Sequence, residues 1–248
     1  MKVKSILVSQ PEPQTAKSPY FELAEKNSLK INFRPFIQVE GVTAKEFRKT
    51  RIQILEHSAV IFTSRTAIDH FFRICQDLRL TVPDTMKYFC ISESTAFYLQ
   101  KYIVYRKRKI FYANGKFDNL TTVMKKHAGE RFLVPLSDIH KQEIPTLLDK
   151  GGYNYTKAIL YRTVSADLSD LAEIKYDVLV FFSPSGIKSL FQNFPDFEQN
   201  GTRIACFGPS TAKAVREAGL RLDIEAPTSQ APSMTMALEQ YIKKMNKG

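Results

Sequence analysis

The chain has 248 residues, of which 44% are hydrophobic and 25% are charged, a composition that excludes a disordered protein. Its 36 lysines and arginines outnumber its 25 aspartates and glutamates, and the net charge of +11 indicates an anionic partner without choosing among nucleic acid, a membrane surface and a polyanionic small molecule. The apolar runs are strand-sized and residues 1–4 lead straight into a strand, which argues against a membrane span or a signal peptide, so we expect a soluble, cytoplasmic protein.

In the first half of the chain, strand and helix patterns alternate. Residues 4–9 and 29–33 predict strands, residues 20–27 and 44–55 predict helices, and residues 35–42 are extended with alternating sides. The segments 59–72 and 87–98 each predict a strand, a turn rich in Ser and Thr, and a helix. Residues 109–112 then predict a strand and residues 119–127 a helix.

The second half shows the same alternation. Strands are predicted at residues 132–135, 158–164 and 222–226, and helices at residues 144–150 and 233–243. Two further segments, 177–191 and 203–215, each predict a strand, a turn and a helix.

These strand-turn-helix segments repeat along the chain. Ser183 aligns with Ser64 at an offset of 119, and Ser210 aligns with Ser94 at an offset of 116. The chain therefore holds two copies of a βαβαβ-like unit, broadly 1–127 and 128–248. Such alternation predicts an α/β fold with parallel sheets and helices on both faces, in which ligands bind beyond the carboxyl ends of the strands.

Hydroxyl-bearing turns follow the predicted strands. They contain Thr63, Ser64, Ser94, Thr95, Ser183, Ser185, Ser210, Thr211 and Thr228. A Ser or Thr before a helix is most often a cap worth about 1 kcal/mol, but free N–H groups remain at a capped helix start and suit an anion. The sequence contains no GxGxxG, GxxxxGK[ST] or GxSxG motif, so neither a nucleotide cofactor nor a hydrolase elbow is predicted.

Cysteine and histidine usage predicts neither disulfides nor a metal site. The chain has an odd number of cysteines without CxxC spacing, namely Cys75, Cys90 and Cys206. We expect them to be buried, reduced thiols. The histidines share no spacing that would place them on one face: His57, His70, His127 and His140.

One dense basic cluster, YRKRK at residues 105–109, has two interpretations. It can be a solvated, protective edge beside the strand that begins at Ile110, which we favour. It can also be a nucleic-acid patch, although such patches usually include further basic and aromatic residues on the same face.

Several segments together resemble the uroporphyrinogen-III synthase family. They are FFSPSG at 181–186, IACFGPSTAKAVREAGL at 204–220, EAPTSQAPSMTMAL at 225–238, IFTSRTAIDHFF at 61–72, LYRTV at 160–164 and residues 18–40. The resemblance covers nearly the whole chain and implies two similar, flavodoxin-like α/β domains joined by a two-stranded connector. On this sequence, residues 1–34 would join 167–248 in one domain, residues 42–158 would form the inserted domain, and residues 35–41 and 159–166 would connect them.

The resemblance also implies an activity and a set of site residues. Members of the family cyclise hydroxymethylbilane, a linear tetrapyrrole polycarboxylate, to uroporphyrinogen III, with inversion of the last pyrrole, loss of water and no metal or cofactor. Tyr161 matches the tyrosine implicated in departure of the hydroxyl group. Substrate-binding or shaping residues would be Thr63, Ser64, Ser94, Thr95, Ser183, Ser185, Gly186, Ser210, Thr211 and Thr228.

Two departures from the family pattern concern local substrate contacts. Many bacterial members have an arginine where this chain has Ser9 and Gln10, and a glycine near the position of Ser92, where this chain has none. We expect a monomer, possible substrate hand-over from hydroxymethylbilane synthase, and no nucleic-acid or membrane partner. The rival interpretations are a non-catalytic, two-domain sensor of an anionic metabolite and, more weakly, nucleic-acid binding through residues 105–109.

Overall fold

The computed structural model describes residues 2–171 and 175–246, and the chain divides into two compact units. Unit 1 contains Met1–Gln38 and Val164–Gly248, and unit 2 contains Val39–Thr163. Both boundaries fall inside strands, β3 (Ile37–Gly41) and β8 (Tyr155–Ser165). The two sequence repeats do not coincide with the units, because the point between residues 127 and 128 lies within unit 2.

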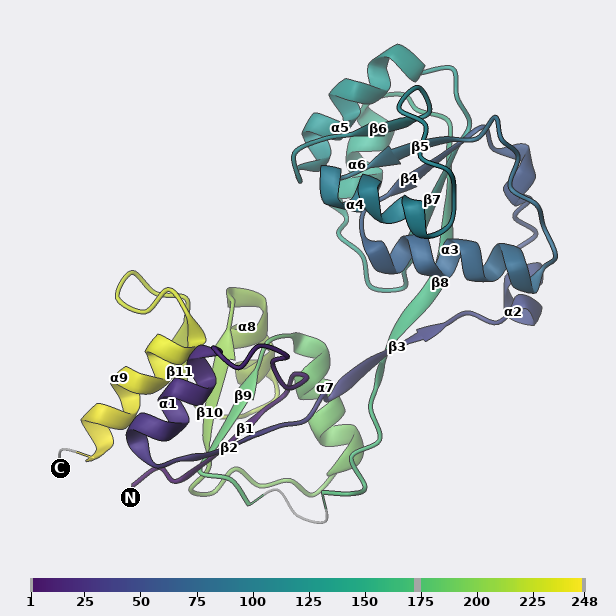
Figure 1. The fold of residues 1–248 in the computed structure, drawn as a ribbon. Helices are drawn as coiled ribbons and strands as arrows, with labels where there is room; N and C mark the ends of the chain where they lie inside the picture. The colour runs from purple at the N-terminus through teal and green to yellow at the C-terminus, as the bar shows by residue number, and fades with distance from the viewer. Residues whose placement is uncertain (1, 172–174, 247–248) are drawn as a thin grey trace. The chain divides into compact units, whose positions relative to one another are not determined.

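Unit 1 is a parallel sheet with the strand order β11-β10-β9-β1-β2 (Figure 1). Its strands are β1 (Ser5–Val8), β2 (Lys30–Phe33), β9 (Val178–Phe181), β10 (Arg203–Phe207) and β11 (Leu222–Ala226). Its helices are α1 (Pro19–Asn27), α7 (Pro184–Asn193), α8 (Pro209–Glu217) and α9 (Met234–Asn246). Successive strand residues point to opposite faces, so Ile6 and Val8 pack under α1 and α9, whereas Leu7 packs under α7 and α8.

Unit 2 has the strand order β3-β8-β7-β4-β5-β6. Its remaining strands are β4 (Ala59–Phe62), β5 (Lys87–Cys90), β6 (Ile110–Tyr112) and β7 (Phe132–Ser137). Its helices are α2 (Ala44–Lys49), α3 (Arg65–Asp77), α4 (Glu93–Tyr98), α5 (Phe117–Met124) and α6 (Glu143–Lys150), with short 3-10 turns at Ile54–Glu56, Leu99–Lys101 and Lys125–His127. Val60 and Phe62 face α3 and α4, whereas Ala59 and Ile61 face α5 and α6.

The predicted α/β fold with parallel sheets is confirmed in both units. The predicted helix at residues 44–55 is too long, because α2 ends at Lys49. The Thr50 hydroxyl donates to the carbonyl of Phe47 at 2.7 Å, and Arg51 adopts a φ of 58°. A residue in the left-handed region stops an α-helix, and the apolar residues beyond it form a separate turn at Ile54–Glu56.

All three cysteines are buried and free, as predicted. Burial raises the pKa of Cys75 and of Cys90 to about 12 and that of Cys206 to about 11. The thiols are therefore protonated and behave as small apolar side chains. Among the described helices, none is long and apolar enough to cross a membrane.

Asp177 joins the two segments of chain that make up unit 1. Its carboxylate accepts hydrogen bonds from the backbone N–H groups of Lys4 at 2.8 Å and Ser5 at 2.9 Å, and from the Ser5 hydroxyl at 3.1 Å. Burial opposes ionisation, but these hydrogen bonds outweigh it and hold the pKa of Asp177 below its usual value of 3.8. The carboxylate therefore ties the start of β1 to the residue that precedes β9.

Replacing Asp177 tests this connection. Asp177→Asn removes the charge from three hydrogen bonds, and we expect the free energy of unfolding in denaturant to fall by about 2 kcal/mol at pH 7. Because the folded-state pKa is lowered, the stabilisation is present above about pH 4 and is lost as the pH falls through the folded pKa. Asp170→Asn, at an exposed ion pair with Arg34, is the matched control and should cost less than about 1 kcal/mol. A difference between Asp177→Asn and wild type that stays the same from pH 7 to pH 2 would contradict the assignment.

Candidate functional site

In unit 1, polar turns follow neighbouring strands at one edge of the sheet. Ser9 follows β1, Ser183 follows β9, Gly208 follows β10 and Thr228 lies beyond β11. Because these strands are parallel neighbours, their carboxyl ends share an edge. The edge therefore brings together residues from both segments of the unit.

The turn after β9 is a capped helix start. The Ser183 hydroxyl accepts the N–H of Gly186 at 3.2 Å and caps α7. Gly186 is buried, and a Cβ there would lie 3.3 Å from the Phe181 ring and 3.9 Å from the Ser9 hydroxyl oxygen. Gly186 therefore shapes the turn, while Ser185 is half-buried in the first turn of the helix.

The turns after β10 and β11 differ in what they expose. Helix α8 is preceded by Gly208, which has a φ of 91° and no side chain with which to cap the helix. Ser210 is exposed in the first turn of α8, whereas Thr211 is only 1% exposed. The Thr228 hydroxyl accepts the N–H of Ala231 at 3.0 Å and closes an exposed turn. Free N–H groups and hydroxyls of this kind are suited to carboxylates.

In unit 2, the carboxyl edge of the sheet contains a cavity of about 590 Å³. Its lining comes from the ends of several strands and includes Thr63, Ser64, Lys116, Ser137, His140 and Tyr161. A smaller cavity of about 280 Å³ is lined by Met86, Tyr88, Lys109 and Ile110, which lie at or just before the beginnings of β5 and β6. The larger cavity is the candidate site, because it contains three of the predicted residues, Thr63, Ser64 and Tyr161, and lies where parallel sheets bind ligands. Ser94 and Thr95, also in unit 2, do not line it.

Tyr161 is held against α3. Its hydroxyl lies 3.4 Å from the Ser64 hydroxyl oxygen, and its ring stacks on His70 with the centroids 5.0 Å apart and the planes 17° apart. The Ser64 oxygen also accepts the N–H of Ala67 at 3.0 Å, so Ser64 is the cap of α3. The Tyr161 hydroxyl thus lies at the positive end of a 13-residue helix, where negative charge is stabilised.

In the turn after β5, the residue that caps the helix is not one of the predicted residues Ser94 and Thr95. The cap is Ser92, whose hydroxyl accepts the N–H of Thr95 at 3.3 Å. Thr95 is 5% exposed and its hydroxyl lies 3.0 Å from that of Ser92, whereas Ser94 is exposed. A simple rule would have found Ser92, because the caps Ser64, Ser92 and Ser183 each stand two residues after the last residue of a strand.

Sequence reasoning missed three cavity residues that carry or can carry positive charge. Lys116 follows β6, and His140 and Lys141 follow β7. Asp118 and Glu143, in the first turns of α5 and α6, line the same cavity, so the charge there is mixed. The sequence could have indicated all five residues, because each follows a predicted strand and the carboxyl ends of parallel strands form the ligand-binding edge.

The basic cluster at residues 105–109 lies away from this cavity. It directly precedes β6, which is one of the two edge strands in the sheet order of unit 2. Arg106 forms an ion pair with Asp84 at 3.2 Å, and the Tyr105 ring stacks on Phe97 with the centroids 5.6 Å apart.

Comparisons with known proteins agree with this architecture. A family model described as uroporphyrinogen-III synthase HemD matches residues 18–236. A uroporphyrinogen-III synthase from Chlorobaculum parvum is 25% identical over 257 residues, which cover 97% of this chain and all of that protein. A uroporphyrinogen-III synthase from Saccharomyces cerevisiae is 26% identical over 140 residues, half of each chain.

Two solved structures share the fold. A uroporphyrinogen-III synthetase from Helicobacter pylori has a TM-score of 0.60 at 17% identity and covers 97% of this chain and 99% of its own. A mutant uroporphyrinogen III synthase from Thermus thermophilus has a TM-score of 0.52 at 15% identity and covers 99% of this chain and 100% of its own. At these identities the structural likeness concerns the fold.

Proposed function

The chain belongs to the uroporphyrinogen-III synthase family, and from that premise we propose how its own residues carry out the reaction. A uroporphyrinogen-III synthase closes hydroxymethylbilane into uroporphyrinogen III with inversion of the last pyrrole and loss of water, a step of tetrapyrrole and haem biosynthesis. The observation that carries this function is the family match over residues 18–236. The rival function, a sensor that binds an anionic metabolite without chemistry, has no comparable support.

Substrate binding is assigned to the turns at the carboxyl edges of the two sheets. The accessible hydroxyls of Thr63, Ser64, Ser94, Ser183, Ser185, Ser210 and Thr228 would donate to substrate carboxylates, together with the N–H groups at the starts of α7 and α8. Gly186, Thr95 and Thr211 are buried and would shape these turns. Hydrogen bonds to an ionised carboxylate are about twice as strong as neutral ones, and the net charge of +11 favours a polyanion.

Tyr161 is assigned to the departure of the hydroxyl group. The C–O bond of the hydroxymethyl group breaks more easily when the leaving oxygen receives a proton or a hydrogen bond, and a phenol is protonated at neutral pH and can donate one. The organic product is a cation-like azafulvene, which the substituted carbon of the terminal pyrrole attacks to give a spiro intermediate that rearranges. The Ser64 hydroxyl, whose oxygen lies 3.4 Å from the phenol oxygen, has a single proton, so it would donate to that oxygen during this step in place of a substrate carboxylate.

The organisation of the protein around this reaction is also proposed. Residues 1–34 and 167–248 would act as one domain, residues 42–158 as the other, and residues 35–41 and 159–166 as connectors, which is supported by unit boundaries inside β3 and β8. Three reduced thiols fit a cytoplasmic enzyme. We also propose that the protein acts as a monomer. Direct hand-over of hydroxymethylbilane from hydroxymethylbilane synthase would shorten the time in which this substrate can close spontaneously.

The isomer of the product tests the function. Hydroxymethylbilane closes spontaneously to uroporphyrinogen I, so we expect purified protein to shift the product to uroporphyrinogen III, with heat-denatured protein as the control. Chromatographic separation of the two isomers measures the ratio. Binding of the substrate with an unchanged isomer ratio would favour the sensor.

Ser183 separates capping from substrate binding. Ser183→Ala should lower the free energy of unfolding by about 1 kcal/mol through loss of the cap, whereas Ser183→Asp should retain the cap. Ser183→Asp should nevertheless raise KM about tenfold, because it presents a negative charge to a substrate carboxylate. Ser169→Asp makes the same change of charge at an exposed position before β9 and should leave KM unaltered. An unaltered KM for Ser183→Asp would leave Ser183 with the capping role alone.

Tyr161 is tested by removing its hydroxyl while keeping its ring. Tyr161→Phe should lower kcat by about 10²-fold, the usual contribution of a positioned proton donor. Tyr155→Phe is the matched control, because Tyr155 lies on the same strand and its hydroxyl donates to Asp149 at 2.8 Å. Circular dichroism would verify that both variants fold, and wild-type turnover by Tyr161→Phe would remove Tyr161 from the chemistry.

A further inference from the structure

We propose that His70 and Arg73 are positioning residues for Tyr161: Arg73 holds His70 as a neutral ring in one orientation, and His70 holds the phenol ring. The inference rests on the proposed role of Tyr161. It assigns a function to two residues of α3 that the sequence did not single out.

The stacking contact between His70 and Tyr161 supports the part of the proposal in which His70 holds the phenol ring. The rings are nearly parallel, 17° apart, with the centroids separated by 5.0 Å. Ser64, at the start of the same helix, lies 3.4 Å from the hydroxyl end of the tyrosine. Helix α3 therefore contacts Tyr161 both at its ring and at its hydroxyl group, which limits the rotation of the side chain.

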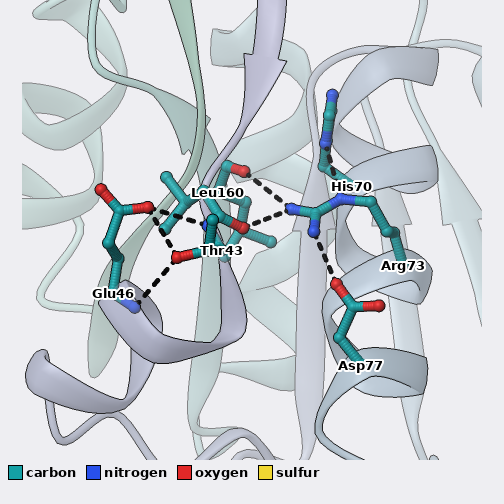
Figure 2. Close-up of polar contacts among 7 residues, drawn as sticks. Thr43, Glu46, His70, Arg73, Asp77 and Leu160 are labelled. Carbon is teal, nitrogen blue, oxygen red and sulfur yellow. Dashed lines mark hydrogen bonds and ion pairs between the residues drawn. The ribbon is translucent and has the colours of Figure 1, made fainter.

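Arg73 determines the state of His70 (Figure 2). The Arg73 Nε–H donates to Nδ1 of His70 at 3.2 Å. A guanidinium has no acceptor, so Nδ1 of His70 must be unprotonated, and the proton of the neutral ring lies on Nε2. A doubly protonated imidazole would place an N–H group against the Arg73 N–H and break this hydrogen bond.

Arg73 is itself fixed by three further acceptors, which Figure 2 shows around its guanidinium. Nη1 donates to Asp77 at 2.7 Å, and Nη2 donates to the backbone carbonyl of Val42 at 2.7 Å and that of Leu160 at 3.4 Å. Leu160 directly precedes Tyr161, and its carbonyl also accepts the N–H of Val42 at 2.9 Å. Arg73 therefore contacts the backbone beside Tyr161 as well as the ring that stacks on it.

Gly41 makes this position of Arg73 possible. A Cβ on Gly41 would lie 2.8 Å from the Arg73 Cζ and Nη2 atoms and 2.9 Å from Nε. Such distances are shorter than van der Waals contact allows, so any larger residue would displace the guanidinium. The absence of a side chain at Gly41 therefore leaves the space that the Arg73 guanidinium occupies, an observation separate from the hydrogen bonds of Arg73.

The charges around His70 favour its neutral form. Burial is the main cause that lowers the pKa of His70, and the Arg73 charge adds to it, while Asp69 acts in the opposite direction. The Asp69 carboxylate accepts hydrogen bonds from Tyr98 and Lys101, each at 3.0 Å, which draws its charge toward α4. Tyr161 is the group that faces His70 from β8. A neutral ring adds no further positive charge beside Tyr161, where the cation-like intermediate is proposed to form.

A double-mutant cycle with Tyr161 tests the inference. We expect His70→Ala to lower kcat about tenfold or more through misplacement of the phenol, and His70→Phe to recover most of it, because phenylalanine restores a flat ring. In the Tyr161→Phe background, His70→Ala should have no further effect on kcat. Equal losses from His70→Ala in the two backgrounds would overturn the inference, and an unaffected kcat in Tyr161→Phe alone would instead overturn the proposed role of Tyr161.

A second measurement does not depend on activity. The chain has four histidines, so the imidazole resonances of His70 can be assigned in the NMR spectrum by their loss in His70→Phe. We expect the pKa of His70 to rise in Arg73→Gln, which removes the neighbouring charge, and to change less in Arg73→Lys, which retains it. An identical titration in wild type and Arg73→Gln would overturn the role of Arg73.

The pH profile provides the last distinction. As the pH falls through the pKa of His70, protonation breaks the hydrogen bond from Arg73, and kcat of the wild type should fall. His70→Phe cannot titrate at this position, so its kcat should decline less over the same range. A purely structural role for His70 predicts parallel profiles for the two proteins, and that result would contradict the inference.

Discussion

Parallel pairing of the strands is the constraint on which both candidate edges depend. Neighbouring strands run in the same direction from β11 to β2 in unit 1 and from β8 to β6 in unit 2. A parallel neighbour is reached only through a crossover, here usually a helix. The crossovers that run through a helix therefore begin at the same edge of their sheet, each with a turn and a helix start, and turns that are distant in sequence become neighbours in space.

The strands that carry these turns are anchored by burial on both faces. Ile6 and Ile61, each 0% exposed, represent opposite units, and a fully buried side chain of this size contributes about 2 kcal/mol. Because packing holds the strands, the turn residues at their ends need not contribute to the core. Their hydroxyls and N–H groups remain available for an anionic ligand, and the same arrangement is repeated at both edges.

The proposed proton donor, Tyr161, is contacted at its ring by His70 and at its hydroxyl by Ser64. A cation that cannot lose its proton, Arg73, lies beside His70 and dictates which nitrogen of that ring carries a proton. The ring then packs on the phenol, and the Ser64 hydroxyl oxygen lies 3.4 Å from the Tyr161 hydroxyl. In the proposed mechanism the neighbours orient the ring, and the phenol itself donates the proton to the substrate.

The α/β class, the parallel sheets and the Ser/Thr turns were determined by the sequence itself, because apolar periodicity and turn residues act locally. Local patterns could not locate the end of α2 at Lys49, since the apolar residues beyond it continue a helical spacing that the conformation of Arg51 interrupts. They could not single out Arg73 either, because its acceptors Val42 and Leu160 lie 31 and 87 residues away and are backbone carbonyls. Only the tertiary structure decided these features, because a backbone acceptor leaves no signature in the identity of the residue that supplies it.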